Sequence, residues 1–157
     1  MPELHEQLLK CYGDHYVEHS KGDVWFDGVA KMLKELQDLG VQLAVATGKS
    51  RKGLDRVLAQ TQSEHLFRAT RAASETKSKP DPLMLAEILA ETEVNAENAI
   101  MVGDTSYDLE MAKNIAMPRV GVTYGVHTSE VLNSYSPLCI VQNVEDLHAF
   151  LVEQVKA

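Results

Sequence analysis

Three short polar clusters in the sequence have residue types suited to phosphoryl chemistry. Thr47-Gly48-Lys49-Ser50 combines two hydroxyls with a lysine, Lys79 stands between a serine and a proline, and GDTSYD at 103–108 carries Asp104 and Asp108. Hydroxyls and backbone N–H groups bind phosphoryl oxygens, a lysine neutralises their charge, and carboxylates are the hard ligands that Mg²⁺ prefers. These residue types are compatible with a small anionic ligand.

The first cluster matches only part of the phosphate-loop motif. Gly48-Lys49-Ser50 matches the end of GxxxxGK[ST], but Leu43 stands where that motif needs its first glycine. A hydroxyl and a run of backbone N–H groups at a helix N-terminus still make an anion cradle. The alternative is that Thr47 and Ser50 only cap the following helix, and the cluster taken alone favours capping.

The second cluster is a loop lysine with a stiffened backbone. Pro80 and Pro82 restrict the chain around Lys79, so this side chain is better placed than in an ordinary loop. A lysine here can neutralise a phosphoryl group. Most loop lysines simply face water, so Lys79 alone is a weak signal.

The third cluster is the strongest. Gly103-Asp104 directly follows the apolar run AIMV, and a tight loop that presents carboxylates suits Mg²⁺. The alternative is that Thr105 or Ser106 caps the next helix and Asp108 complements its dipole. That alternative leaves Asp104 unexplained, because Asp104 precedes the cap.

These clusters fall between elements that alternate along the chain. Apolar runs predict strands, and amphipathic spacing predicts helices. Strands are expected at 41–46, 67–72, 99–102, 119–125 and 139–143, and helices at 3–19, from Val29 to a C-cap at Gly40, and at 50–60, 82–92, 107–115 and from Val144 onward. This alternation predicts an α/β fold with a doubly wound parallel sheet, in which ligands bind beyond the carboxyl ends of the strands.

The composition excludes several classes of protein. With 157 residues, 45% of them hydrophobic and 24% charged, the chain is expected to form one soluble α/β domain. A net charge of -8 argues against nucleic acid or an anionic membrane as the partner. Cys11 and Cys139 are too few and too distant for a disulfide framework or a cysteine zinc site. With no apolar run long enough for a bilayer and no signal sequence, the protein is expected to be cytoplasmic.

In order and spacing, the three clusters resemble the second, third and fourth motifs of the haloacid dehalogenase superfamily. ATGKSRKGLDRVL, SKPDP and MVGDTSYDLEMA are similar to its phosphoglycolate phosphatase-like branch. The resemblance implies a Mg²⁺-dependent phosphatase with a Rossmann-like core, acting on a small phosphorylated metabolite through an aspartyl-phosphate intermediate. It implies that Thr47, Gly48 and Lys49 bind the phosphoryl oxygens, Lys79 neutralises charge, and Asp104 and Asp108 hold the metal.

The family's first motif, DxDx[TV], which supplies the aspartate nucleophile, occurs nowhere in this chain. WFDGVAKMLKELQDLG resembles the re-entry into the core after a helical cap. Residues 1–22 are therefore expected to be a cap remnant and linker, and 23–157 a core domain that lacks its first strand. The chain as given is expected to be inactive, whether through a misplaced gene start, truncation or proteolysis.

A missing central strand would leave the strands at 41–46 and 99–102 without a neighbour. Two rows of unpaired backbone groups would cost as much as a domain's whole stability. The two strands are thus expected to pair directly, or a complementing N-terminal fragment or a second copy of the chain is expected to fill the slot.

Two other functions fit parts of the pattern. A non-catalytic relative that keeps the fold and the metal loop as a binding or regulatory module is the main alternative. A phosphoacceptor receiver domain also uses aspartates, a threonine and a lysine, but its acidic residues precede the other two, whereas here they follow.

Overall fold

The computed structural model describes residues 8–11, 28–77, 81–123 and 128–156. In these ranges six strands form one sheet in the order β3-β2-β1-β4-β5-β6, and every neighbouring pair is parallel. The strands are β1 (Leu8–Cys11), β2 (Gln42–Thr47), β3 (Phe67–Ala72), β4 (Ala99–Gly103), β5 (Arg119–Val122) and β6 (Cys139–Val141). The predicted doubly wound parallel sheet is confirmed.

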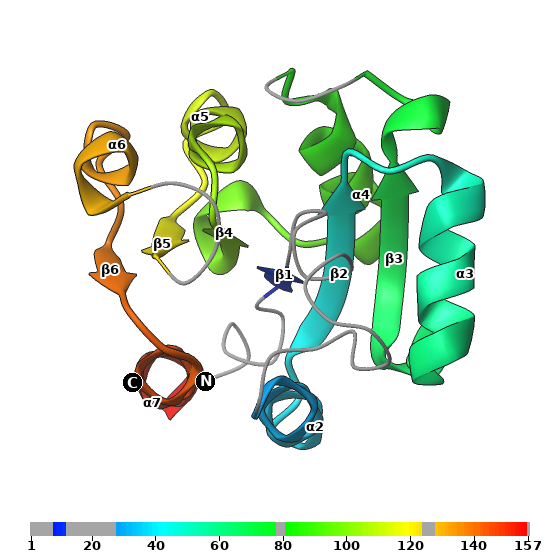
Figure 1. The fold of residues 1–157 in the computed structure, drawn as a ribbon, viewed down its shortest axis with the longest axis horizontal. Coiled ribbons are helices and arrows are strands. Elements are labelled where there is room, and N and C mark those ends of the chain that lie inside the picture. The colour runs from blue at the N-terminus through cyan, green and yellow to red at the C-terminus, as the bar shows by residue number, and fades with distance from the viewer. Residues whose placement is uncertain (1–7, 12–27, 78–80, 124–127, 157) are drawn as a thin grey trace.

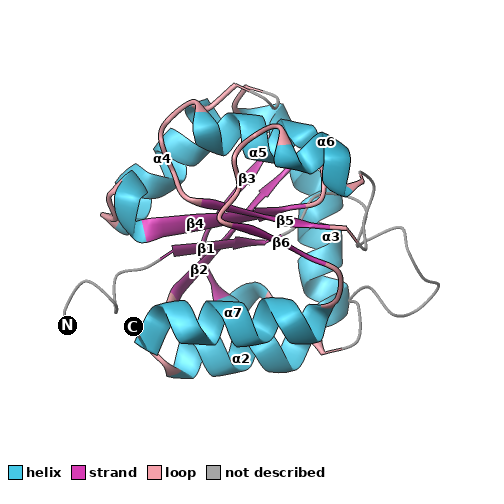
Figure 2. Ribbon diagram, turned by 90° about the vertical axis from the view of Figure 1, so that its left-hand side faces the viewer, coloured by secondary structure: helices cyan, strands magenta, loops and turns pink. Residues whose placement is uncertain are grey.

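Helices cover both faces of the sheet (Figure 2). On one face lie α2 (Val29–Asp38) and α7 (Val144–Lys156), and on the other α4 (Leu83–Thr92), α5 (Ser106–Lys113) and α6 (Ser129–Asn133). The helix α3 (Arg51–Thr61) packs Leu54 and Leu58 against β2 and β3. Three short 3₁₀ helices, η2 (Glu64–Leu66), η3 (Ala73–Glu75) and η4 (Ala96–Asn98), join elements. Within the described ranges, no helix has both the length and the apolar character to cross a bilayer.

The alternation of side chains along β2 explains its continuous apolar run. Leu43 packs into the cluster under α2 and α7, whereas Ala44 and Ala46 pack into the cluster under α4. All three residues are at most 1% exposed. A parallel strand covered on both faces buries both sets of side chains, so its sequence lacks the polar alternation of a half-exposed strand.

The sequence predictions after Val29 agree closely with these elements. The C-cap of α2 is Leu39, one residue before the predicted position, and Gly40 follows it with φ +92°. This left-handed conformation suits glycine, because it has no Cβ. The short helix α6 was not predicted, since its five residues carry too few apolar positions to show a helical period.

The N-terminal prediction is wrong where the structure describes it. A helix was expected over 3–19, but Leu8–Cys11 form β1, which lies between β2 and β4 in the middle of the sheet (Figure 1). Leu9 pairs with Leu43 on one side and with Ile100 on the other. The physical reason is that the backbone N–H and C=O groups of β2 and β4 need hydrogen-bond partners, and β1 supplies them.

The chain's own residues therefore fill the slot. β2 and β4 do not pair directly, because β1 lies between them. Self-association or a complementing N-terminal fragment remains a prediction. The assignment of residues 8–11 to a cap helix, and the expectation of a core without a strand at this position, are both corrected. The rest of the proposed cap and linker lies outside the described residues, so the boundary at residue 22 remains a prediction.

Candidate functional site at the carboxyl edge of the sheet

Thr47 ends β2 and begins the turn into α3. Its side chain is buried, with 3% exposed, and its Oγ1 accepts a hydrogen bond from the Lys49 N–H at 3.2 Å. Ser50 caps α3, because its Oγ accepts from the Gly53 N–H at 3.1 Å. The capping alternative therefore holds for Ser50 and not for Thr47, whose hydroxyl orders the turn instead.

The Lys49 N–H donates a hydrogen bond to the Thr47 hydroxyl. The role in phosphoryl binding that the resemblance implies for Lys49 remains a prediction. A hydroxyl has one hydrogen to donate and two lone pairs to accept with. By occupying one lone pair, the Lys49 N–H helps to set the direction in which the Thr47 hydroxyl donates.

Asp104 and Asp108 are both fully buried, Asp104 on the turn from β4 into α5 and Asp108 in the first turn of α5. Thr105 is the N-cap of α5. Its Oγ1 accepts from the Asp108 N–H at 3.2 Å, while Asp108 Oδ2 accepts from the Thr105 N–H at 3.2 Å and the Thr105 hydroxyl at 2.9 Å. Thr105 is thus the cap that the capping alternative named, and Asp108 takes part in the cap through its side chain. The metal-binding role of Asp108 remains a prediction. Asp104 lies one residue before the cap and is not part of it.

Gly103 allows this turn to close. A Cβ at position 103 would lie 2.3 Å from Asp108 Cβ and 2.9 Å from Asp108 Oδ2, which is closer than real Cβ contacts come. Asp108 therefore packs onto the end of β4 only because residue 103 has no side chain. The glycine before Asp104 was noted in the sequence. The reason for it, which is room for the Asp108 carboxylate five residues further along the chain, needs the structure.

Thr47 and Asp104 stand at the same level on either side of β1. Lys10 is paired with Ala44 of β2 and with Met101 of β4. Thr47 is three residues beyond Ala44, and Asp104 is three residues beyond Met101. Two strand spacings separate β2 from β4, which is about 10 Å across the sheet. The hydroxyl and the carboxylate thus flank the carboxyl end of the central strand, where the strand order reverses direction and ligands bind in such folds.

The donor set at this edge fits Mg²⁺ in its chemistry. Two buried carboxylates on one tight turn are hard oxygen ligands, and Mg²⁺ binds through one or two carboxylates together with water and substrate phosphate. Within the part of the chain that the structure describes, no three His, Cys, Asp or Glu side chains gather as a metal site. Lys79, from the second predicted cluster, lies outside the described residues, so its place relative to these groups remains a prediction.

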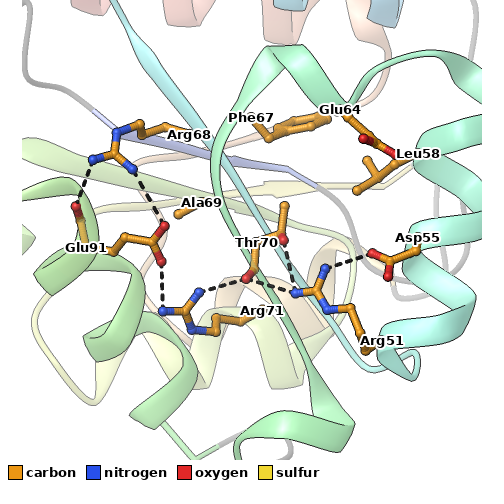
Figure 3. A pocket seen from close by; sticks show the side chains of 10 residues that line it. All are labelled: Arg51, Asp55, Leu58, Glu64, Phe67, Arg68, Ala69, Thr70, Arg71 and Glu91. Carbon is orange, nitrogen blue, oxygen red and sulfur yellow. Dashed lines mark hydrogen bonds and ion pairs between the residues drawn. The ribbon is translucent and has the colours of Figure 1, made fainter.

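A depression of about 570 Å³ opens elsewhere, along the outer edge of β3 between α3 and α4 (Figure 3). Ion pairs line it: Arg71 Nη2 of β3 is 2.8 Å from Glu91 Oε1 of α4, and Arg51 Nη1 is 3.0 Å from Asp55 Oδ1 within α3. Among the described residues, its lining includes none of the predicted site residues and consists of Arg51, Asp55, Leu58, Glu64, Phe67, Arg68, Ala69, Thr70, Arg71 and Glu91. Sequence reasoning gave no sign of it, because its charged residues come from four separate elements, α3, η2, β3 and α4.

The strand order and the polar carboxyl edge define a doubly wound α/β protein with a candidate anion and metal site at its switch point. The family model for haloacid dehalogenase-like hydrolases matches residues 1–122, and the chain belongs to this family.

Relatives of known description agree with this assignment. The chain is 30% identical over 149 residues to a phosphoglycolate phosphatase from Pseudomonas putida, covering 94% of this chain and 54% of that protein. It is 26% identical to the pyrophosphatase PpaX from Halalkalibacterium halodurans, covering 93% of this chain and 69% of that protein. The crystal structure of a protein described as a predicted phosphatase from Clostridium acetobutylicum superposes with a TM-score of 0.76 at 30% identity, over 82% of this chain and 60% of that one. The chain thus spans about half the length of the first of these relatives.

Proposed function

We propose that this chain is part of a Mg²⁺-dependent phosphatase that hydrolyses a small phosphorylated metabolite. The observation that carries the proposal is the equal level of Thr47 and Asp104 on the two strands that flank β1. A phosphoryl group bound between them would meet a hydroxyl donor on one side and a metal-binding carboxylate on the other. The phosphatase relatives support this reaction class, and their different names leave the particular ester open.

Each residue has a proposed role in the reaction. The Thr47 hydroxyl and the Gly48 N–H donate to phosphoryl oxygens, and Lys79 offsets the charge shared by nucleophile and phosphoryl group. Asp104 holds Mg²⁺ directly, and Asp108, engaged in the cap, holds the turn or reaches the ion through water. Bound Mg²⁺ neutralises charge on the phosphoryl oxygens.

The covalent step needs an aspartate that this sequence does not contain. In the family it is the first residue of DxDx[TV]. Its carboxylate attacks phosphorus, the ester P–O bond breaks, and the second aspartate gives a proton to the leaving oxygen. Water then cleaves the aspartyl phosphate and releases inorganic phosphate. We therefore propose that residues 1–157 alone do not turn over phosphate esters and that the site acts in a cytoplasmic protein that includes this motif.

The test is a fusion that places a family segment carrying DxDx[TV] ahead of this chain. The added strand has to take the slot between β2 and β4 that Leu8–Cys11 fill here. We expect Mg²⁺-dependent release of phosphate from small esters by the fusion and none by residues 1–157. Hydrolysis by the unfused chain at an enzymatic rate would mean that the catalytic centre lies elsewhere.

The absent nucleophile favours one other function, a non-catalytic module that binds a phosphorylated ligand. The same fusion separates the two. A fusion that binds phosphate and Mg²⁺ through Thr47 and Asp104 but releases no phosphate from any ester would support the binding module.

A further inference from the structure

Three contacts join the turn after β2 to η3, the short helix after β3. The Ala73 N–H donates to the Lys49 carbonyl at 3.0 Å, and the Arg51 N–H donates to Ser74 Oγ at 2.9 Å. The Arg51 guanidinium forms an ion pair with the Glu75 carboxylate. Each of the three residues of η3 is therefore bound to the segment 49–51, which directly follows Thr47 and Gly48.

The ion pair is the charged member of this set. The Arg51 and Glu75 side chains are 34% and 36% exposed, so water screens the pair only in part. The hydrogen bond between them raises the pKa of Arg51 and, as the largest effect, lowers the pKa of Glu75 below its ordinary value. Glu75 Oε1 also accepts from the Ala72 N–H at 2.9 Å, which fixes this carboxylate at the end of β3.

The same guanidinium holds the outer edge of β3 (Figure 3). Arg51 Nη2 donates to the Thr70 carbonyl at 3.1 Å and to the Thr70 hydroxyl at 3.0 Å. Its Nη1 binds Asp55, one turn along α3. Side chains that occupy the N–H of Ala72 and the carbonyl of Thr70 also keep another strand from pairing with this edge. Edge protection alone is the purely structural explanation of Arg51.

That explanation does not account for the contacts at the turn. Edge protection requires only Thr70 and Ala72, whereas the Lys49 carbonyl and the Arg51 N–H are also tied to η3. Lys49 is the residue whose N–H orders the Thr47 hydroxyl. Glu75 is thus connected to Thr47 by a chain of contacts through Arg51 and Lys49, within the five residues from 47 to 51.

We propose that Arg51 and Glu75 are positioning residues that hold the turn at Gly48–Ser50 in the conformation that binds a phosphoryl oxygen. This inference rests on the proposed function, because it assigns a role to two residues that touch neither the phosphoryl group nor the metal. Glu75 is also four residues before Lys79 in the sequence.

The variant pair Glu75→Gln and Asp55→Asn tests the proposal in residues 1–157. Both remove one carboxylate from the same guanidinium, but only Glu75 connects it to η3. The first readout is amide hydrogen exchange at Ala73 and Arg51, measured by NMR. We expect faster exchange at both in Glu75→Gln, unchanged exchange in Asp55→Asn, and recovery in Glu75→Asp, which keeps the charge.

The second readout is the affinity for inorganic phosphate, followed by the shifts of the Gly48 and Lys49 amide signals. Partly exposed ion pairs contribute modestly, so we expect a loss of about threefold to fivefold in Glu75→Gln and less than twofold in Asp55→Asn. Thermal unfolding of each variant identifies a temperature at which all are folded. A merely structural role would lower the melting temperature and leave phosphate affinity in the folded protein unchanged.

The outcomes separate this inference from the proposed function. Thr47→Val should abolish phosphate binding. If the unchanged chain binds no phosphate, or Thr47→Val binds it equally well, the phosphate site itself fails and the positioning role fails with it. If phosphate binds through Thr47 but Glu75→Gln matches Asp55→Asn in both readouts, only the positioning role is overturned.

Discussion

Thr47 and Asp104 are each three residues beyond a residue paired with Lys10, one on β2 and the other on β4. Their level at the sheet edge is thus set by the register of the central strand. A change in the register of β1 with only one of its two neighbours would change the level of Thr47 relative to Asp104. The geometry of the candidate site depends on four residues, Leu8–Cys11, that carry none of its chemistry.

The role of β1 leads to the first prediction. Leu9→Pro removes a backbone N–H from a central strand, where proline is tolerated only at edges or bulges. We expect a loss of about 3 kcal/mol or more in the free energy of unfolding. Ser129→Pro is the matched control, because Ser129 is the first residue of α6, where proline suits the helix. Chemical denaturation measures the free energy of unfolding of both variants. Equal stability of Leu9→Pro and the unchanged chain would contradict a central strand at Leu8–Cys11.

Gly103→Ala gives the second prediction. The added methyl group would meet Asp108 Cβ at 2.3 Å, so the turn between β4 and α5 must shift. We expect a loss of about 1–3 kcal/mol in unfolding free energy, together with displaced amide signals for Thr105 and Asp108. In Gly53→Ala the new Cβ would find its nearest neighbour, Ser50 Oγ, at 3.4 Å, an ordinary contact within α3.

Alanine is the better helix former, so Gly53→Ala should be neutral or stabilise the protein by up to about 1 kcal/mol. The two glycine variants therefore move stability in opposite directions. If both are neutral, the close packing of Asp108 on the end of β4 is not real.

Asp104→Asn in the fusion protein gives the third prediction. The substitution keeps the size of the side chain and removes its charge, so the metal loses a hard anionic ligand. We expect a fall in kcat of about 10²–10³-fold and a higher Mg²⁺ concentration for half-maximal activity. Asp38→Asn, which removes a carboxylate from an exposed ion pair on α2, is the control and should leave both values unchanged. A Mg²⁺ response that is the same in Asp104→Asn as in the parent would exclude this residue as a ligand.

Most of the fold after Val29 followed from the sequence because its signals are local. Apolar runs identified β2 and β4, and apolar spacing identified α2 and α7. Asp104 was singled out because it lies between a strand and a helix cap, and the structure indeed leaves it outside the cap of α5. Such signals need no knowledge of which elements become neighbours.

The sequence predictions failed where the structure of a segment depends on elements that are distant in the sequence. Leu4, Leu8, Tyr12 and Tyr16 have helical spacing, but the slot between β2 and β4 requires extended backbone, and tertiary pairing overrides a weak local preference in β1. The contacts of Arg51 with Thr70 and Glu75 span 19 and 24 residues, so no local pattern shows them. The same holds for the reason why residue 103 is glycine.

The pH dependence of the Arg51–Glu75 pair gives the last prediction. Because the pKa of Glu75 is lower in the folded protein than its ordinary value of 4.5, the folded state favours the charged carboxylate. The pair therefore stabilises the fold at pH above 4.5, and this contribution is lost as the pH falls through the lowered pKa. With both side chains about one-third exposed, we expect it to be about 0.2–1 kcal/mol at pH 7. The unfolding free energies of Glu75→Gln and the unchanged chain, measured with urea, should thus differ by this amount at pH 7 and converge as the pH falls below the lowered pKa of Glu75. A difference that grows on acidification would contradict the assigned sign.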